Sequence, residues 1–252
     1  MIEQLSNHSS FKMKNQTAWY NNSDFWIKNH QPNSNVQNLL SKKISELSIE
    51  IGRPLRILDI GCGAGWVKNI IPPSSTYIGV DLCREFIKKN LDFENQNTRF
   101  LHLDFEEPIS DAIAHSLNVD LVICCLSLIE MPEISIALEN IKKVLTSSGQ
   151  LFIVGLEPIT EIYRYCTDNN KCNLQFLLNF FYFSEKPLVL EKNIKINNRV
   201  SEKKYFRILY SDSDYIHCSK KFGFSLVEKI DLEDSNVFSV PVYQFIALKN
   251  GK

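Results

Sequence analysis

The chain has 252 residues, of which 44% are apolar and 23% charged, and its formal net charge is −1. These values are typical of a globular protein with one α/β domain and an elaboration. They give no electrostatic basis for binding a nucleic-acid backbone, and no apolar run is long enough to span a membrane. Seven cysteines without a disulfide-framework spacing, and a polar N-terminus that is no signal peptide, predict reduced thiols and a cytoplasmic protein.

Residues 1–35 are predicted to form an N-terminal segment outside the core. Its first half, to about residue 17, is polar, and we expect it to be mobile. The second half is rich in aromatic residues that need to be covered by something. Plain packing against the domain is one interpretation, and a lid over a ligand site is the other. If the segment is a lid, the residues expected to contact the substrate are Trp19, Tyr20 and Trp26.

The core is predicted over residues 36–156. It begins with a helix whose apolar residues recur at helical spacing from Val36 to Leu47. The helix is followed by an apolar strand at Arg56–Ile60. Apolar side chains on both faces are typical of a central strand in a parallel sheet.

A glycine-rich turn follows this first strand, with the sequence Gly61-Cys62-Gly63-Ala64-Gly65-Trp66. Gly61 and Gly63 allow the chain to turn sharply and to approach a ligand closely, because a Cβ would block both. We expect a helix to open after the turn with its amide groups facing the ligand. A second apolar strand ends at Asp81, twenty residues after Gly61, where a carboxylate can accept hydrogen bonds from a ribose.

The order of the glycines distinguishes two kinds of nucleoside ligand. A dinucleotide fingerprint has a third glycine where this chain has Trp66. Asp59, two residues before the turn, would repel a pyrophosphate but suits a cationic ligand. The stretch resembles the first motif of class I S-adenosylmethionine-dependent methyltransferases, in which an acid precedes G-x-G-x-G. The resemblance implies S-adenosylmethionine as cofactor, S-adenosylhomocysteine as product, and cofactor contacts from Asp59, Gly61, Cys62, Gly63, Gly65, Asp81 and Leu82.

Two later strands resemble the same family. The strand at Thr98–Leu103 ends before Asp104 and Phe105, a pair that resembles the family's contact with the adenine ring, although Asp104 as a turn cap is the alternative. The strand at Asp120–Leu126 is predicted to place three residues against the methionine part of the cofactor: Cys124, Cys125 and Leu126. No metal site is predicted, because neighbouring strand residues face opposite sides of a sheet and no second Cys or His pair has ligand spacing.

Residues 157–210 leave the core pattern after a fifth strand at Gln150–Leu156. A helical stretch at Pro158–Phe183 and a hairpin are predicted to form a substrate-capping insert, with a mere extension of the core as the alternative. Residues 211–252 return to the sheet. The predicted fold is α/β and Rossmann-like, with a seven-stranded, mostly parallel sheet, an antiparallel strand seven, helices on both faces, and the helix-hairpin insert between strands five and six.

Methyl transfer from a sulfonium depends mainly on positioning, and it needs a base only when the acceptor is protonated. Glu157, directly after strand five, is the candidate base, and Tyr205 the candidate to hold the acceptor. Glu130 and Arg207 are predicted to contact the substrate. We therefore expect an enzyme, monomeric or homodimeric, that methylates an N or O atom of a small aromatic or apolar molecule.

Three other classes of protein compete with this interpretation. A nicotinamide-dependent enzyme would need a glycine in place of Trp66. An aminopropyl transferase would carry a paired-acid motif after strand four, and Asp120 comes too early for it. A catalytically silent S-adenosylmethionine-binding or scaffold protein with the same fold stays open as an alternative, because a fold does not fix a function.

Overall fold

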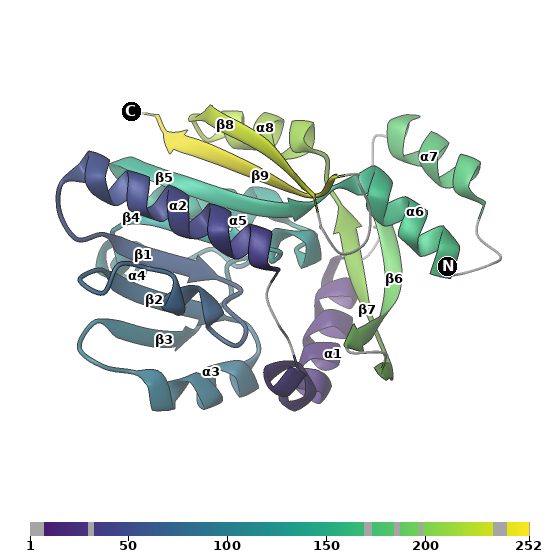
Figure 1. The fold of residues 1–252 in the computed structure, drawn as a ribbon, viewed down its shortest axis with the longest axis horizontal. Coiled ribbons are helices and arrows are strands. Elements are labelled where there is room, and N and C mark those ends of the chain that lie inside the picture. The colour runs from purple at the N-terminus through teal and green to yellow at the C-terminus, as the bar shows by residue number, and fades with distance from the viewer. Residues whose placement is uncertain are drawn as a thin grey trace.

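A seven-stranded sheet lies at the centre of the computed structural model, with the strand order β3-β2-β1-β4-β5-β9-β8 (Figure 1). The structure describes residues 8–29, 33–168, 173–183, 187–196, 199–233 and 241–251. The strands of this sheet are β1 (Arg56–Ile60), β2 (Thr76–Asp81), β3 (Thr98–His102), β4 (Val119–Cys125), β5 (Leu145–Leu156), β8 (Phe224–Glu233) and β9 (Pro241–Asn250). The first five run parallel, and β9 pairs antiparallel with β5 and β8. The predicted Rossmann-like sheet with an antiparallel last strand is confirmed.

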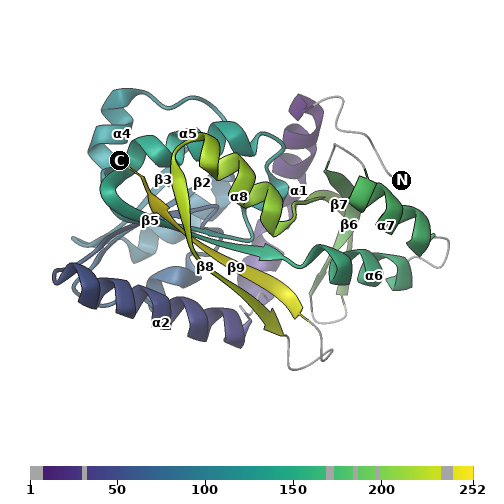
Figure 2. The ribbon, with the colours of Figure 1, turned by 90° about the horizontal axis from the view of Figure 1, so that it is seen from above.

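Helices cover both faces of this sheet, as Figure 2 shows for α2 on one side and α4, α5 and α8 on the other. Their bounds are α2 (Ser34–Ile51), α3 (Arg84–Asn90), α4 (Asp111–Leu117), α5 (Ile134–Val144) and α8 (Asp212–Lys221). Leu40 and Ile44 of α2 belong to the apolar cluster on one face, and Leu138 and Ile141 of α5 belong to the cluster on the other. The central strands are buried from both sides, which explains their nearly continuous apolar sequence.

The helix predicted after the glycine turn is reduced to one 3₁₀ turn, η1 (Trp66–Asn69). Pro72 and Pro73 follow almost at once, and proline both lacks an amide donor and restricts the residue before it. The turn therefore has no α-helix behind it to supply aligned amide groups. Helix α4 was not predicted, because its seven residues are too few to show a period.

The N-terminal segment is one long helix, α1 (His8–Asn29), where a mobile stretch was expected before an aromatic lid. It lies beside β7 (Arg199–Leu209), as both views show (Figures 1 and 2). The buried Asn15 fixes this contact: its side-chain oxygen accepts a hydrogen bond from Phe206 N at 2.7 Å, and its nitrogen donates to Phe206 O at 2.9 Å. A single amide side chain thus satisfies both backbone groups of a residue on β7.

The insert contains two helices where one was predicted, α6 (Pro158–Asp168) and α7 (Leu174–Phe183). Strand β6 (Leu188–Ile196) pairs antiparallel with β7, so the predicted hairpin is present. Ile162 of α6, Leu177 of α7 and Leu190 of β6 share a small apolar cluster separate from the main core. The insert therefore has packing of its own and extends beyond the end of the sheet (Figure 2).

Replacing Asn15 by alanine should loosen the attachment of α1 to β7. The change leaves the N–H and C=O of Phe206 without their partner, and we expect a loss of about 1–3 kcal/mol in the free energy of unfolding. Hydrogen exchange at the Phe206 amide should accelerate at the same time. Denaturant unfolding and amide exchange measured by NMR check the two effects.

The matched control is Asn21→Ala, because Asn21 is exposed on the same helix and its side chain bonds only within α1, to Thr17 O. This variant should keep the exchange rate of Phe206. Equal rates in Asn15→Ala and Asn21→Ala would show that the Asn15 side chain does not hold the helix in place.

Candidate functional site

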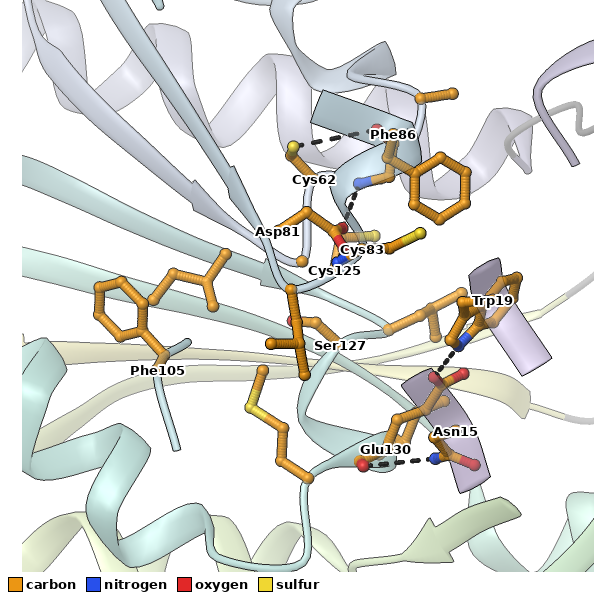
Figure 3. Close-up of a pocket in the computed structure, with 18 of the residues that line it drawn as sticks. Asn15, Trp19, Cys62, Asp81, Cys83, Phe86, Phe105, Cys125, Ser127 and Glu130 are labelled. Atoms are coloured by element: carbon orange, nitrogen blue, oxygen red, sulfur yellow. Dashed lines mark hydrogen bonds between the residues drawn. The ribbon is translucent and has the colours of Figure 1, made fainter. Parts of the chain in front are cut away.

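A cavity of about 560 Å³ lies at the carboxyl ends of the parallel strands (Figure 3). Its walls come from the glycine turn, the ends of β2, β3 and β4, the 3₁₀ turn η3 (Leu128–Glu130), and the helix α1 with β7. The carboxyl edge of a parallel sheet is where ligands bind in open α/β folds, and the volume is in the range of small-molecule sites. The core and the N-terminal and inserted segments thus build one site together.

The glycine turn forms the first wall. Gly61, Gly63 and Gly65 have φ values of 70°, 50° and 70°, a backbone region that suits glycine. A Cβ on Gly61 would lie 2.4 Å from Ser127 Cβ, so the loop after β4 prevents any side chain there. A Cβ on Gly63 would meet nothing within 4 Å, so the backbone opens onto the cavity at this residue. Gly65 packs against Phe100 behind the turn and lies outside the cavity.

The Asp81 carboxylate lies beside this opening. Gly63 N donates to its Oδ2 and Cys83 N donates to its Oδ1, both at 2.8 Å. Burial raises the pKa of Asp81 to about 6, against the effect of these hydrogen bonds. Each oxygen keeps a second lone pair for a ligand. Asp81, which was predicted to contact a ribose, lines the cavity, and so does the neighbouring Leu82.

Besides Gly65, two residues predicted to contact the cofactor lie outside the cavity. Asp59 is buried beneath the turn, where Tyr77 OH donates to its Oδ2 at 2.7 Å, and burial raises its pKa to about 7. Because side chains alternate along β1, Asp59 faces the α2 side together with Ile57. Cys124 is likewise turned into the core on the α5 side, whereas Cys125 and Leu126 line the cavity.

The end of β3 supplies Asp104 and Phe105, both at the cavity wall. The Oδ1 atom of Asp104 accepts a hydrogen bond from Glu106 N at 2.9 Å, so this carboxylate does cap a turn. Its Oδ2 atom pairs with Lys12 Nζ of α1, at 2.5 Å. Asp104 therefore faces the cavity with one oxygen already held by a cation from the N-terminal helix.

The far end of the cavity contains Glu130 of η3, Trp19 of α1 and Arg207 of β7. The Trp19 indole N–H donates to Glu130 Oε2, and Asn15 Nδ2 reaches Glu130 O at 3.5 Å (Figure 3). Burial raises the pKa of Glu130 to about 8, while the Trp19 hydrogen bond and the Arg207 charge oppose the rise. Trp26, predicted with Trp19, also lines the cavity.

Glu157, Tyr205 and Tyr20 are not brought to this cavity. Glu157 precedes α6, and its carboxylate accepts from Thr160 N at 2.7 Å, satisfying a free amide of the first helical turn. Tyr205 is buried behind Trp19, with ring centroids 5.6 Å apart, and burial raises its pKa to about 12. Tyr20 is 58% exposed on the outer side of α1. The placement expected for these three residues is therefore wrong.

Other residues line the cavity that the sequence did not single out, among them Lys12, Asn15, Gln16, Cys83, Phe86, Ser127, Met131 and Tyr243. Three of these belong to α1, and with Trp19 and Trp26 they occupy positions i, i+3, i+4, i+7 and i+14 of the helix, counted from Lys12. Residues at this spacing lie on one face of a helix. The sequence therefore contained the signal for a helix that presents one face to the cavity. In the described ranges, no group of three His, Cys, Asp or Glu residues could hold a metal ion. No described helix is long and apolar enough to cross a membrane.

Replacing Glu130 by glutamine should change how stability depends on pH. The folded pKa of about 8 exceeds the ordinary value of 4.5, so the folded protein binds the proton more tightly than the unfolded chain. Stability should fall as pH rises from about 5 to 8, and Glu130→Gln should reduce this slope by at most about 1.4 kcal/mol per pH unit. Urea unfolding at several pH values measures the slope. The exposed Glu50→Gln is the control, and identical slopes in wild type and Glu130→Gln would refute the raised pKa.

Residues 58–153 match the family Methyltransf_11, a methyltransferase domain. No curated protein sequence matches the chain. Among solved structures, a methyltransferase of Burkholderia thailandensis has a TM-score of 0.59 at 14% identity, covering 100% of this chain and 95% of its own; its title names 1,6-didemethyltoxoflavin-N1-methyltransferase with bound 1,6-didemethyltoxoflavin and S-adenosylhomocysteine.

Two further structures are similar at comparable levels. The N-methyltransferase NodS of Bradyrhizobium japonicum WM9, in complex with S-adenosylhomocysteine, has a TM-score of 0.58 at 13% identity and covers 94% of this chain and 100% of its own. An S-adenosylmethionine-dependent methyltransferase of Clostridium acetobutylicum ATCC 824 has a TM-score of 0.57 at 17% identity, covering 84% and 91%. At these sequence identities, the similarity to the three structures shows a shared fold and nothing more. Residues 58–153 are therefore similar to a methyltransferase domain, and the chain has the fold of the S-adenosylmethionine-dependent methyltransferases that it resembles in structure.

Proposed function

We propose that this chain is an enzyme that binds S-adenosylmethionine in the 560 Å³ cavity and transfers its methyl group to an N or O atom of a small molecule. The observation that carries the proposal is the continuity of the cavity, which runs from Gly63 and Asp81 at the glycine turn to Glu130 and Trp19 at the far end. The family match supports the same activity. So does the small-molecule methyltransferase among the similar structures.

The residues at the glycine turn fit the cofactor. Gly63 presents bare backbone, and the spare lone pairs of Asp81 suit the two ribose hydroxyls. Asp104 and Phe105 would hold the adenine. Four carboxyl side chains line the cavity, against the two cations Lys12 and Arg207; they are Asp81, Asp104, Glu106 and Glu130. Because burial raises the pKa of Glu130 to about 8, this group is mostly uncharged at neutral pH, and Asp81 and Asp104 are the carboxylates that favour a positively charged ligand.

The far end fits the methyl acceptor. The bound cofactor would supply a methyl group whose C–S bond breaks, with the pair left on sulfur, as an acceptor lone pair forms the new bond. Glu130 lies at this end of the cavity and can take the proton that the acceptor N–H or O–H releases, a role expected for Glu157 from the sequence. Helix α1 forms one wall of the site and so limits the access of water to it. The net charge of −1 supports a small acceptor over a nucleic acid, and the cysteine pattern supports a cytoplasmic enzyme.

A silent cofactor-binding protein is the second candidate. The observation in its favour is that α1 is tied across the cavity by contacts to three different elements. Besides Asn15 and Lys12, Asp24 forms an ion pair with Lys89 of α3. A helix held in this way would impede entry of an acceptor, and such a protein would bind S-adenosylmethionine without turnover.

Calorimetry on the purified protein tests the proposal with S-adenosylmethionine and S-adenosylhomocysteine as ligands, and NAD and decarboxylated S-adenosylmethionine as controls. Micromolar binding of the first two alone is the expected result. Binding of NAD in their place, or of none of the four, would overturn the cofactor assignment. Where the cofactor binds, methyl transfer to a panel of small aromatic N–H and O–H compounds separates the enzyme from the silent protein.

Replacing Asp81 by alanine should weaken the binding of S-adenosylhomocysteine by about 1.5–3 kcal/mol, the usual loss for hydrogen bonds to a charged group. The change also removes the acceptor of the Gly63 and Cys83 amides, which could destabilise the fold. The free energy of unfolding must therefore be measured together with the affinity. Asp92→Ala is the matched control, because Asp92 is exposed and lies outside the cavity. Unchanged affinity in Asp81→Ala would remove the ribose contact from this residue.

A further inference from the structure

Glu130 is a carboxyl group at the cavity wall that has no cation of its own. It is half-buried on η3, and its Oε2 accepts a hydrogen bond from the indole N–H of Trp19 on α1 (Figure 3). In the parts of the chain that the structure describes, no salt bridge joins Glu130 to a cation. A carboxyl group taken out of water needs either a positive partner or a proton. Burial accordingly raises the pKa of Glu130 to about 8, so the group carries a proton at neutral pH.

The charged and titratable groups nearest to Glu130 in the fold do not remove this proton. Arg207 of β7 acts on Glu130, but its guanidinium is bound to the buried Glu161 of α6 at 3.1 Å. Asp81 at the end of β2 adds a charge of the same sign as an ionised Glu130. Tyr205 of β7 stays neutral, because burial raises its pKa to about 12.

The remaining charged groups of the cavity lie at the end of β3. Lys12 of α1 lines the cavity there and is bound to Asp104 and Glu107. Glu106 follows in the same loop, and burial raises its pKa to about 7. Both cations among the described residues of the cavity wall are thus engaged by other carboxylates, and Glu130 is left without one.

The proposed ligand brings a positive charge to this end of the cavity. A base that takes the proton of the methyl acceptor is separated from the sulfonium only by the methyl group and the reacting atom. A cation at such close range favours the ionised form of a carboxyl group. The effect is stronger in a cavity than at an open surface, because little water screens the two charges.

We propose that Glu130 is protonated before the methyl donor binds and loses this proton to solvent when the sulfonium enters the cavity, so that the base exists only in the loaded site. The inference rests on the proposed function and concerns the regulation of the same site. During transfer, the acceptor lone pair forms the bond to the methyl carbon, the C–S pair stays on sulfur, and the acceptor proton passes to the Glu130 carboxylate. Sulfonium and carboxylate both become neutral, which returns Glu130 to the form that the protein favours without the donor.

The test compares S-adenosylmethionine with S-adenosylhomocysteine, which lacks the methyl group and the sulfonium charge. Calorimetric titration of the full chain in two buffers of different ionisation enthalpy measures the protons released on binding. At about pH 7.5, S-adenosylmethionine should release about 0.5 proton more than S-adenosylhomocysteine. Because the ionised site binds the cation better, the affinity for S-adenosylmethionine relative to S-adenosylhomocysteine should rise about tenfold between about pH 6 and pH 9.

Glu130→Gln should remove both differences, because glutamine still accepts the Trp19 N–H but does not titrate. The amino groups of the two ligands titrate as well, and their contribution persists in this variant and can be subtracted. Glu106→Gln is the matched control, since Glu106 also lines the cavity with a raised pKa but lies at the end of β3, away from the proposed acceptor. It should keep both differences. Equal proton release in wild type and Glu130→Gln, or loss of the difference in Glu106→Gln alone, would overturn the inference.

Infrared difference spectra of the wild-type protein give a measurement that needs no variant. Binding of S-adenosylmethionine should remove the C=O band of one protonated carboxyl group, and binding of S-adenosylhomocysteine should leave it. If both ligands bind without this difference, the ionisation of Glu130 is wrong while the cofactor assignment stands. If neither ligand binds, the cofactor assignment fails and the inference fails with it.

Discussion

The Asp81 carboxylate ties the glycine turn to the segment that follows β2. One oxygen binds the amide of Gly63 and the other binds the amide of Cys83, so two loops from neighbouring strands are fixed to a single side chain. This constraint holds Gly63 open toward the cavity and sets the start of α3. Because η1 is only one 3₁₀ turn, the carboxylate does the orienting that a following α-helix does in dinucleotide-binding folds.

The other end of the site depends on polar contacts between elements far apart in the sequence. Asn15 joins α1 to β7, Trp19 joins α1 to η3, and Arg207 joins β7 to α6 through Glu161. Each bond is largely shielded from water, where a lost partner is costly. The shape of the site therefore depends on the presence of α1.

The sequence predicted the sheet, and most of the residues expected to bind the cofactor lie at one cavity, because both depend on local patterns. Apolar strands, three closely spaced glycines and an acid at a fixed number of residues after the first glycine can be recognised from the order of residues alone. The acceptor end was predicted less well, because it is made by tertiary contacts. Glu157 follows a core strand as a catalytic base should, yet it caps α6. Asp59 has the expected position in the motif, yet the alternation along β1 turns it to Tyr77. Neither outcome can be read from spacing alone.

The bond between Asn15 and Phe206 joins residues that are 191 positions apart. During synthesis, α1 leaves the ribosome before the sheet, while β7 appears only after the first five strands of the sheet are complete. Contacts of such long range form late, because the loop-closure entropy must be overcome first. The glycine turn and Asp81 can thus be in place in a nascent chain that still has no acceptor wall. Until β7 emerges, the stripe of Phe11, Ala18 and Trp19 on α1 lacks the strand against which it packs in the folded protein.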